Sequence, residues 1–168
     1  MPENEYSRPA TLEDLKKVIR SLNDNQAKYI LIGGYALFSH GYHRATEDID
    51  LLIPDSSAAS KPIIDALLVL ADKESANLDS AWFDEGENIR LADEVVVDLI
   101  FKTCGETYET LKPYIETVDL DGIWVQTLSL KGLIKTKQSV RDKDVMDRLV
   151  LERAMKAIQQ KTKSESSF

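Results

Sequence analysis

The sequence predicts an α+β (α/β-like) fold, in which a mixed β-sheet is flanked by helices and followed by a C-terminal helical segment. Short apolar runs typical of strands alternate with helical patterns over the first hundred residues. Asp121-Gly122, between alternating apolar residues, is a strong hairpin signal. After residue 128 only helical patterns follow.

The helices are predicted from their end signals and their apolar periodicity. Thr11, with Asp14 three residues later, forms a capping box that begins a helix over about 11–26. Gly41 is a typical helix-stop residue at the end of the next helical pattern. Further helices are expected over residues 35–41, 61–72, 129–138 and 141–158. We expect the polar residues after 158 to be frayed.

Strands are expected over residues 28–34, 48–54, 88–94 and 94–101, and the hairpin over 116–127. The thirteen residues between Gly34 and Asp48 are long enough for a helical crossover between the first two strands. The predicted domain organisation has three parts: a core over 1–128, a helical segment packed on it over 129–160, and a flexible tail over 161–168.

The composition of the 168-residue chain is that of an ordinary globular protein, with 43% hydrophobic and 30% charged residues. No apolar run approaches the ~18 residues of a membrane span, so we expect no membrane association. The acidic N-terminus is unlike a signal peptide. The single cysteine, Cys104, excludes an internal disulfide and suggests a reducing, cytoplasmic location. We expect its side chain to be buried.

The net charge of −8 is unevenly distributed along the chain. Residues 1–130 contain 11 Lys and Arg against 24 Asp and Glu, which is −13, whereas residues 131–148 contain 6 against 3, which is +3. The acidic body argues against a broad nucleic-acid-binding face. A local basic wall that meets a phosphate-bearing ligand is compatible with this distribution.

The first candidate site is the carboxylate pair Asp48 and Asp50 at the start of a predicted strand. Residues i and i+2 of a strand point to the same face, about 6.8 Å apart. Two carboxylates on one face repel each other unless a cation lies between them, and hard oxygen ligands suit Mg²⁺ or Mn²⁺. The alternative is that the pair forms the solvated face of an edge strand.

Asp98 lies in the apolar run 94–101, where an unpaired carboxylate is costly. If Asp98 were a third ligand to the same metal ion, its position would be explained, and an ion pair with a basic residue such as Arg90 is the alternative.

Gly33 and Gly34 form the third candidate feature. A glycine pair between strand and helix allows close approach of backbone N–H groups to a phosphate.

The stretches "GGYALFSHGYHRATEDIDLLI" and "VVVDLI" resemble the polymerase-beta-type nucleotidyltransferase superfamily. "HGYHRATEDIDLLI" is most similar to small prokaryotic nucleotidyltransferases related to abortive-infection and toxin–antitoxin proteins. "LIKTKQSVRDKDVMDRLVL" resembles the helical segment of the same group, in which a lysine precedes an R-x-K-D-x-x-D run. The resemblance covers residues 29–150 in separated blocks, and it implies the nucleotidyltransferase fold.

The resemblance also implies a role for each matching position. Asp48, Asp50 and Asp98 would be catalytic and would bind the metal ions that carry the NTP substrate. The implied nucleotide-binding residues are Gly33, Gly34, Arg44, Thr46 and Lys137, with Arg141, Lys143, Asp144 and Asp147 as further candidates. The alternative for Arg44 and Thr46 is an ordinary surface arginine and a threonine at the entry to the strand. Many relatives have serine where this chain has Gly34. The alternative for much of the 141–147 run is an ion-pair network on a helix surface.

The implied reaction transfers a nucleoside monophosphate from an NTP to a hydroxyl of a tRNA end, a protein side chain or a small molecule. The resemblance also raises the role of a toxin with a cognate antitoxin as partner. Two other functions stay open at the level of sequence. One is a protein of the same fold that binds a nucleotide or a partner without catalysis, and the other is a metal-dependent phosphohydrolase.

Overall fold

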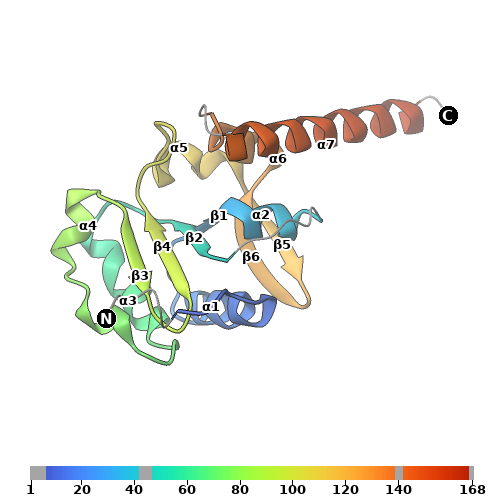
Figure 1. The fold of residues 1–168 in the computed structure, drawn as a ribbon. Helices are drawn as coiled ribbons and strands as arrows, with labels where there is room; N and C mark the ends of the chain where they lie inside the picture. The colour runs from blue at the N-terminus through green and yellow to red at the C-terminus, as the bar shows by residue number, and fades with distance from the viewer. Residues whose placement is uncertain (1–6, 42–46, 139–141, 167–168) are drawn as a thin grey trace.

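The computed structural model describes residues 7–41, 47–138 and 142–166, without the side chains of 142, 143 and 159–166. Its central feature is a four-stranded sheet formed by β1 (Ile30–Ile32), β2 (Ile49–Leu52), β3 (Ile89–Ala92) and β4 (Val96–Ile100). The strand order is β1-β2-β4-β3 (Figure 1). The β2–β4 pair is parallel and the other two pairs are antiparallel. The predicted mixed sheet is therefore confirmed.

The helix α2 (Gly33–Ser39) connects β1 to β2. Because these two strands are antiparallel, α2 is a connecting helix and not the crossover between parallel strands that the length of the link suggested. The strand β1 is also shorter than predicted. Gly33 and Gly34 form the first turn of α2 instead of the end of the strand.

The helix α1 (Leu12–Asp24) begins with the predicted capping box, in which the side chains of Thr11 and Asp14 each accept from the backbone N–H of the other. Its apolar residues are buried, and it packs against α3 (Ser60–Leu67). The helix α3 ends five residues earlier than predicted. The remaining short helices before the hairpin are η2 (Ser57–Ala59), η3 (Glu74–Asn77), α4 (Ala81–Glu85), α5 (Tyr108–Leu111) and η4 (Lys112–Tyr114).

The predicted hairpin is formed by β5 (Ile115–Leu120) and β6 (Ile123–Leu128). Asp121 and Gly122 both have positive φ, 50° and 87°, as a tight two-residue hairpin turn requires. Ser129 caps α6 (Leu130–Lys135) by accepting from Gly132. The last helix, α7 (Asp142–Ser166), packs on α6 and continues past its predicted end, with its C-terminal part extending beyond the rest of the fold (Figure 1).

Asp50 is the one polar side chain of β2, and Leu52, on the same face, is fully buried. Ile49, Leu51 and Ile53 are fully buried in the core, as the alternation predicts, whereas Asp50 faces the other side and is partly exposed. A carboxylate-bearing face thus lies directly against a continuous apolar core. Among the described helices, none is long and apolar enough to cross a membrane.

Candidate active site

Asp50 and Asp98 are direct partners in the register of the parallel strands β2 and β4. Neighbouring strands lie about 4.8 Å apart, and paired residues point to the same face. Asp48 precedes Asp50 by two positions and therefore shares this face. The tertiary structure brings together the three carboxylates that the sequence singled out, although 48 residues separate Asp50 from Asp98. We call these three residues the carboxylate face.

Gly33 lies against the carboxylate face. A Cβ added to Gly33 would lie 2.2 Å from Oδ2 of Asp50, and its φ of +74° belongs to the left-handed region. Glycine is therefore required here both by its backbone conformation and by the approach of Asp50. The residue before α2, Ile32, has no polar side chain with which to cap the helix, so Gly33 and Gly34 present their N–H groups without a side-chain cap.

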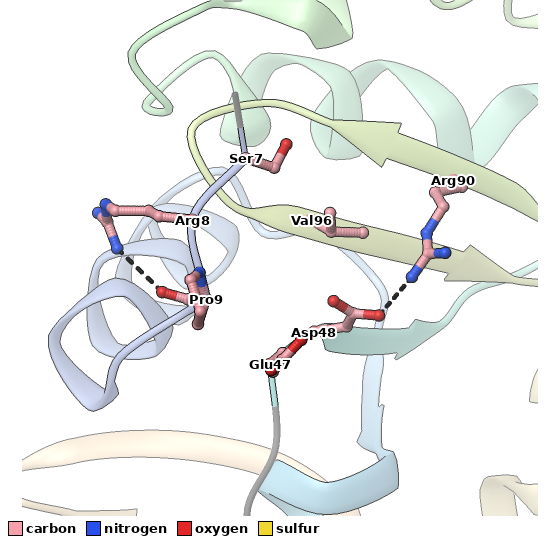
Figure 2. A pocket seen from close by; sticks show the side chains of 7 residues that line it. All are labelled: Ser7, Arg8, Pro9, Glu47, Asp48, Arg90 and Val96. Carbon is pink, nitrogen blue, oxygen red and sulfur yellow. Dashed lines mark hydrogen bonds and ion pairs between the residues drawn. The ribbon is translucent and has the colours of Figure 1, made fainter. Parts of the chain in front are cut away.

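A guanidinium bridges two of the three carboxylates. Arg90, the register partner of Asp98 on β3, forms ion pairs with Oδ2 of Asp48 through Nη2 and with Oδ1 of Asp98 through Nε, the latter at 3.3 Å. Figure 2 shows Arg90 and Asp48 pointing toward each other from β3 and the start of β2. The Arg90–Asp98 ion pair, which the sequence offered as an alternative to a third metal ligand, is therefore present together with the cluster of three carboxylates.

The electrostatics of the carboxylate face centre on Asp50. Burial, the negative charge of Asp98 and a hydrogen bond with Asp98 raise the pKa of Asp50 to about 7, with a smaller contribution from Asp48. The charge of Lys137 acts in the opposite direction on the pKa of Asp50. Burial also raises the pKa of Asp98, against the lowering effect of Arg90. Burial is thus the largest cause of the raised pKa of both Asp50 and Asp98.

Lys137 is held in a buried ion-pair network between α6 and α7. Its ammonium lies 3.5 Å from Oδ1 of Asp144 and 3.1 Å from Oδ2 of Asp147, and its side chain is 9% exposed. Arg148 donates to the carbonyl oxygen of Lys137. The sequence suggested an ion-pair network on the helix surface, but these ion pairs are buried. They are buried because α7 packs its acidic side against the end of α6. Lys137 is still close enough to influence Asp50.

Arg44, Thr46 and Arg141 lie outside the described residues, and so does the side chain of Lys143. Their predicted roles toward phosphate stay predictions.

The comparisons with known proteins bear on the fold. No protein-family model matches the chain, and no curated protein matches it. A solved structure from Thermotoga maritima, described as a "putative nucleotidyltransferase", aligns over 92% of this chain and 92% of its own, with a TM-score of 0.51 and 16% sequence identity. The chain has the nucleotidyltransferase fold. At this level of identity the likeness concerns the fold alone.

Within the nucleotidyltransferase fold, the carboxylate face fits a divalent cation by its donor chemistry. Carboxylate oxygens are hard ligands of the kind that Mg²⁺ and Mn²⁺ prefer. The lack of a Cβ on Gly33 allows the carboxylate of Asp50 to lie directly against the Gly33 backbone. In the described part of the chain no three acidic, histidine or cysteine side chains stand arranged to hold a metal ion. Asp48 and Asp98 instead share Arg90, so rotation of these side chains is needed to bring their oxygens onto one ion.

A polar cavity of about 230 Å³ opens beside Asp48 and Arg90 (Figure 2). Its other lining residues are Ser7, Arg8, Pro9, Glu47 and Val96. Sequence reasoning missed Ser7 and Arg8, because no local pattern indicates that the N-terminal segment reaches the β3–β4 turn. There the backbone N–H of Arg8 donates to the carbonyl oxygen of Glu94, and the hydroxyl of Ser7 donates to that of Asp93.

The prediction for Cys104 was wrong: its side chain is exposed and its thiol contacts the carbonyl oxygen of Thr136.

Proposed function

We propose that this protein is a magnesium-dependent nucleotidyltransferase that moves a nucleoside monophosphate from an NTP to an acceptor hydroxyl. The observation that carries the proposal is the register pairing of Asp50 with Asp98, with Asp48 on the same face and the Gly33 backbone beside Asp50. The raised pKa of Asp50 also supports it, because strongly raised pKa values of buried, adjacent carboxyl groups are typical of functional sites. The nucleotidyltransferase fold supports the reaction class.

In the proposed reaction, the acceptor hydroxyl oxygen forms a bond to the α-phosphorus of the NTP. The bond between that phosphorus and the oxygen bridging to the β-phosphate breaks, and pyrophosphate leaves with the bond electrons. Asp98 accepts the hydroxyl proton, a role that its raised pKa suits. Asp48, Asp50 and Asp98 would hold the divalent cations, which when bound would supply positive charge for the attacking and leaving oxygens.

The proposed nucleotide contacts come from two sides of the carboxylate face. The N–H groups of Gly33 and Gly34 bind a phosphate at the start of α2, where no side chain caps the helix. Lys137 supplies a positive charge from the α6–α7 side. Its charge lowers the pKa of Asp50, so it acts at the distance of the carboxylate face. Arg44 and Thr46 are also proposed to bind the nucleotide, because they match the sequence resemblance.

The proposed acceptor is a hydroxyl of a tRNA end, a protein side chain or a small molecule. The sequence resemblance also supports two further parts of the proposal. One is a role as a toxin with a cognate antitoxin, and the other is Mg²⁺ or Mn²⁺ as the cofactor.

The experiment that tests the proposed function is incubation of the full chain with Mg²⁺ and each of the four α-³²P-labelled NTPs, in the presence of mixed tRNA or cell lysate. We expect label in an acceptor and release of pyrophosphate, both abolished by EDTA and by Asp48→Asn. Asp65→Asn is the matched control, because Asp65 is a carboxylate with a 40% exposed side chain that pairs with Lys61 on the same helix, α3.

Three other results would each contradict the proposal. Release of inorganic phosphate without labelled acceptor indicates a phosphohydrolase. NTP binding without any transfer indicates a non-catalytic binding protein. Activity that is equal in Asp48→Asn and in the unmodified protein removes the carboxylate face from the reaction.

A further inference from the structure

Arg90 occupies the ligand oxygens that a metal ion would need. Its guanidinium pairs with both Asp48 and Asp98. A guanidinium has several N–H donors in a planar fork, so it can bridge two carboxylates as a divalent ion does, but with one positive charge instead of two. The two cations therefore compete for the same oxygens.

The position of Arg90 makes it easy to displace. It lies on β3, an edge strand of the sheet, and its side chain is 55% exposed. The paired side chains of Asp48 and Asp98 are 33% and 24% exposed. Ion pairs with this exposure contribute little to stability, because water screens the charges and re-solvates them on separation. Loss of the Arg90 contacts therefore has a modest cost.

The displaced guanidinium also has a place to go. Arg90 lines the polar cavity of about 230 Å³ beside Asp48, together with Ser7 and Glu47 (Figure 2). A rotation about the side-chain bonds of Arg90 can move its charged end into this solvated space without a shift of the β3 backbone. The same charge is then still near the carboxylate face, but no longer on the metal-binding oxygens.

We propose that Arg90 is a positioning residue that holds Asp48 and Asp98 together without metal and is displaced by the divalent cation, so that it sets the metal affinity of the site. This inference rests on the proposed function, since it requires the carboxylate face to bind a divalent cation. Arg90 keeps the like-charged carboxylates of Asp48 and Asp98 from repelling each other in the metal-free protein. It also lowers the affinity for the ion that replaces it.

The test is Mn²⁺ binding to the full chain, measured from the electron paramagnetic resonance signal of free Mn²⁺, with Arg90→Gln against the unmodified protein. We expect Arg90→Gln to bind Mn²⁺ about three- to tenfold more tightly, because two half-exposed ion pairs no longer compete. Arg8→Gln is the matched control. Arg8 lines the same cavity, but its guanidinium pairs with Asp14 and Glu94, so we expect a change of less than about twofold.

A second measurement does not depend on a variant. In the ¹⁵N-labelled protein, the Nε–H resonance of Arg90 should move when Mg²⁺ saturates the site, because Nε loses its contact with Asp98. An Arg90 resonance that does not respond at saturation overturns the inference. Equal or weaker Mn²⁺ binding by Arg90→Gln also overturns it, and so does an equal gain in Arg8→Gln, which would indicate only a change in net charge.

The failure of this inference differs from the failure of the proposed function. If both proteins bind Mn²⁺ equally and Asp50→Asn abolishes that binding, Arg90 is no competitor but the metal site stands. If neither protein binds Mn²⁺, with or without NTP, the metal-dependent function is contradicted together with the inference.

Discussion

Gly33 and Asp50 approach each other so closely that a single added carbon on Gly33 would lie 2.2 Å from a carboxylate oxygen of Asp50. The contact joins the first turn of α2 to the strand β2, which carries the carboxylate pair. It places the proposed phosphate-binding backbone directly against one of the proposed metal ligands.

Gly33→Ala should both destabilise the protein and abolish Mn²⁺ binding. The methyl group must displace Asp50, and the φ of +74° adds strain of about 1 kcal/mol. Gly105→Ala is the matched control, because Gly105 has a φ of +79° but open space around its Cβ position. Urea unfolding should show a loss about 1–3 kcal/mol larger for Gly33→Ala. Equal losses, or Mn²⁺ binding retained in Gly33→Ala, would contradict the role of this contact.

Asp50→Asn should stabilise the metal-free protein at pH 8. The pKa of Asp50 is about 7 in the folded protein and near 3.8 in the unfolded chain, so the folded state binds the proton more tightly. The free energy of unfolding therefore falls as the pH rises from about 4 to about 7, and levels off above. Asparagine removes this loss, which is of the order of 2 kcal/mol after allowance for solvent.

The measurement is thermal unfolding of Asp50→Asn and the unmodified protein at pH 4 and pH 8, with EDTA. The gain in midpoint should be present at pH 8 and nearly absent at pH 4. Asp65→Asn, at an exposed carboxylate, should show no such difference. Saturating Mg²⁺ should stabilise the unmodified protein at pH 8 and not Asp50→Asn. A destabilised Asp50→Asn at pH 8 would mean that the charge of Asp50 is already compensated.

Asp98→Asn should separate binding from chemistry. Asparagine is nearly isosteric, but it cannot accept the acceptor proton, so we expect nucleotidyl transfer to fall by at least about a hundredfold. NTP binding through the α2 backbone and Lys137 should change much less. Single-turnover transfer and equilibrium NTP binding are the two measurements. A variant that transfers normally would remove Asp98 from the chemical step.

Lys137→Met should destabilise the junction of α6 and α7. Methionine fills a similar volume but leaves the buried carboxylates of Asp144 and Asp147 without their Lys137 contact, at a cost of about 2–4 kcal/mol. Lys131→Met, at an exposed lysine of α6, is the control and should be nearly neutral. Urea unfolding measures both. A small effect of Lys137→Met would show that other contacts of α7 hold these carboxylates.

The role of Lys137 in nucleotide binding can be tested separately from its role in stability. Lys137→Arg retains a positive charge beside Asp144 and Asp147, and should restore much of the stability. Its longer, planar end cannot take the same position toward Asp50, so NTP affinity should recover less than stability does. Full recovery of both would mean that only the charge of residue 137 matters.

Much of the local structure could be predicted because it depends on neighbours in the chain. The capping box of Thr11 and Asp14, the turn at Asp121-Gly122 and the cap of Ser129 all join residues within three positions of each other. The start of α2 was misplaced because "KYILIGG" is apolar throughout, and such a run does not distinguish a strand end from the first turn of a buried helix.

By itself, the sequence determined which side chains share the face of each strand, since alternation along β2 and β4 places Asp48 with Asp50 and buries Ile49 and Leu51. Only the tertiary structure decided that Asp50 is paired with Asp98, that Arg90 bridges two carboxylates, and that Lys137 is buried. The physical reason is range. Periodicity and capping act over a few residues, whereas strand register and buried ion pairs depend on how the whole core packs.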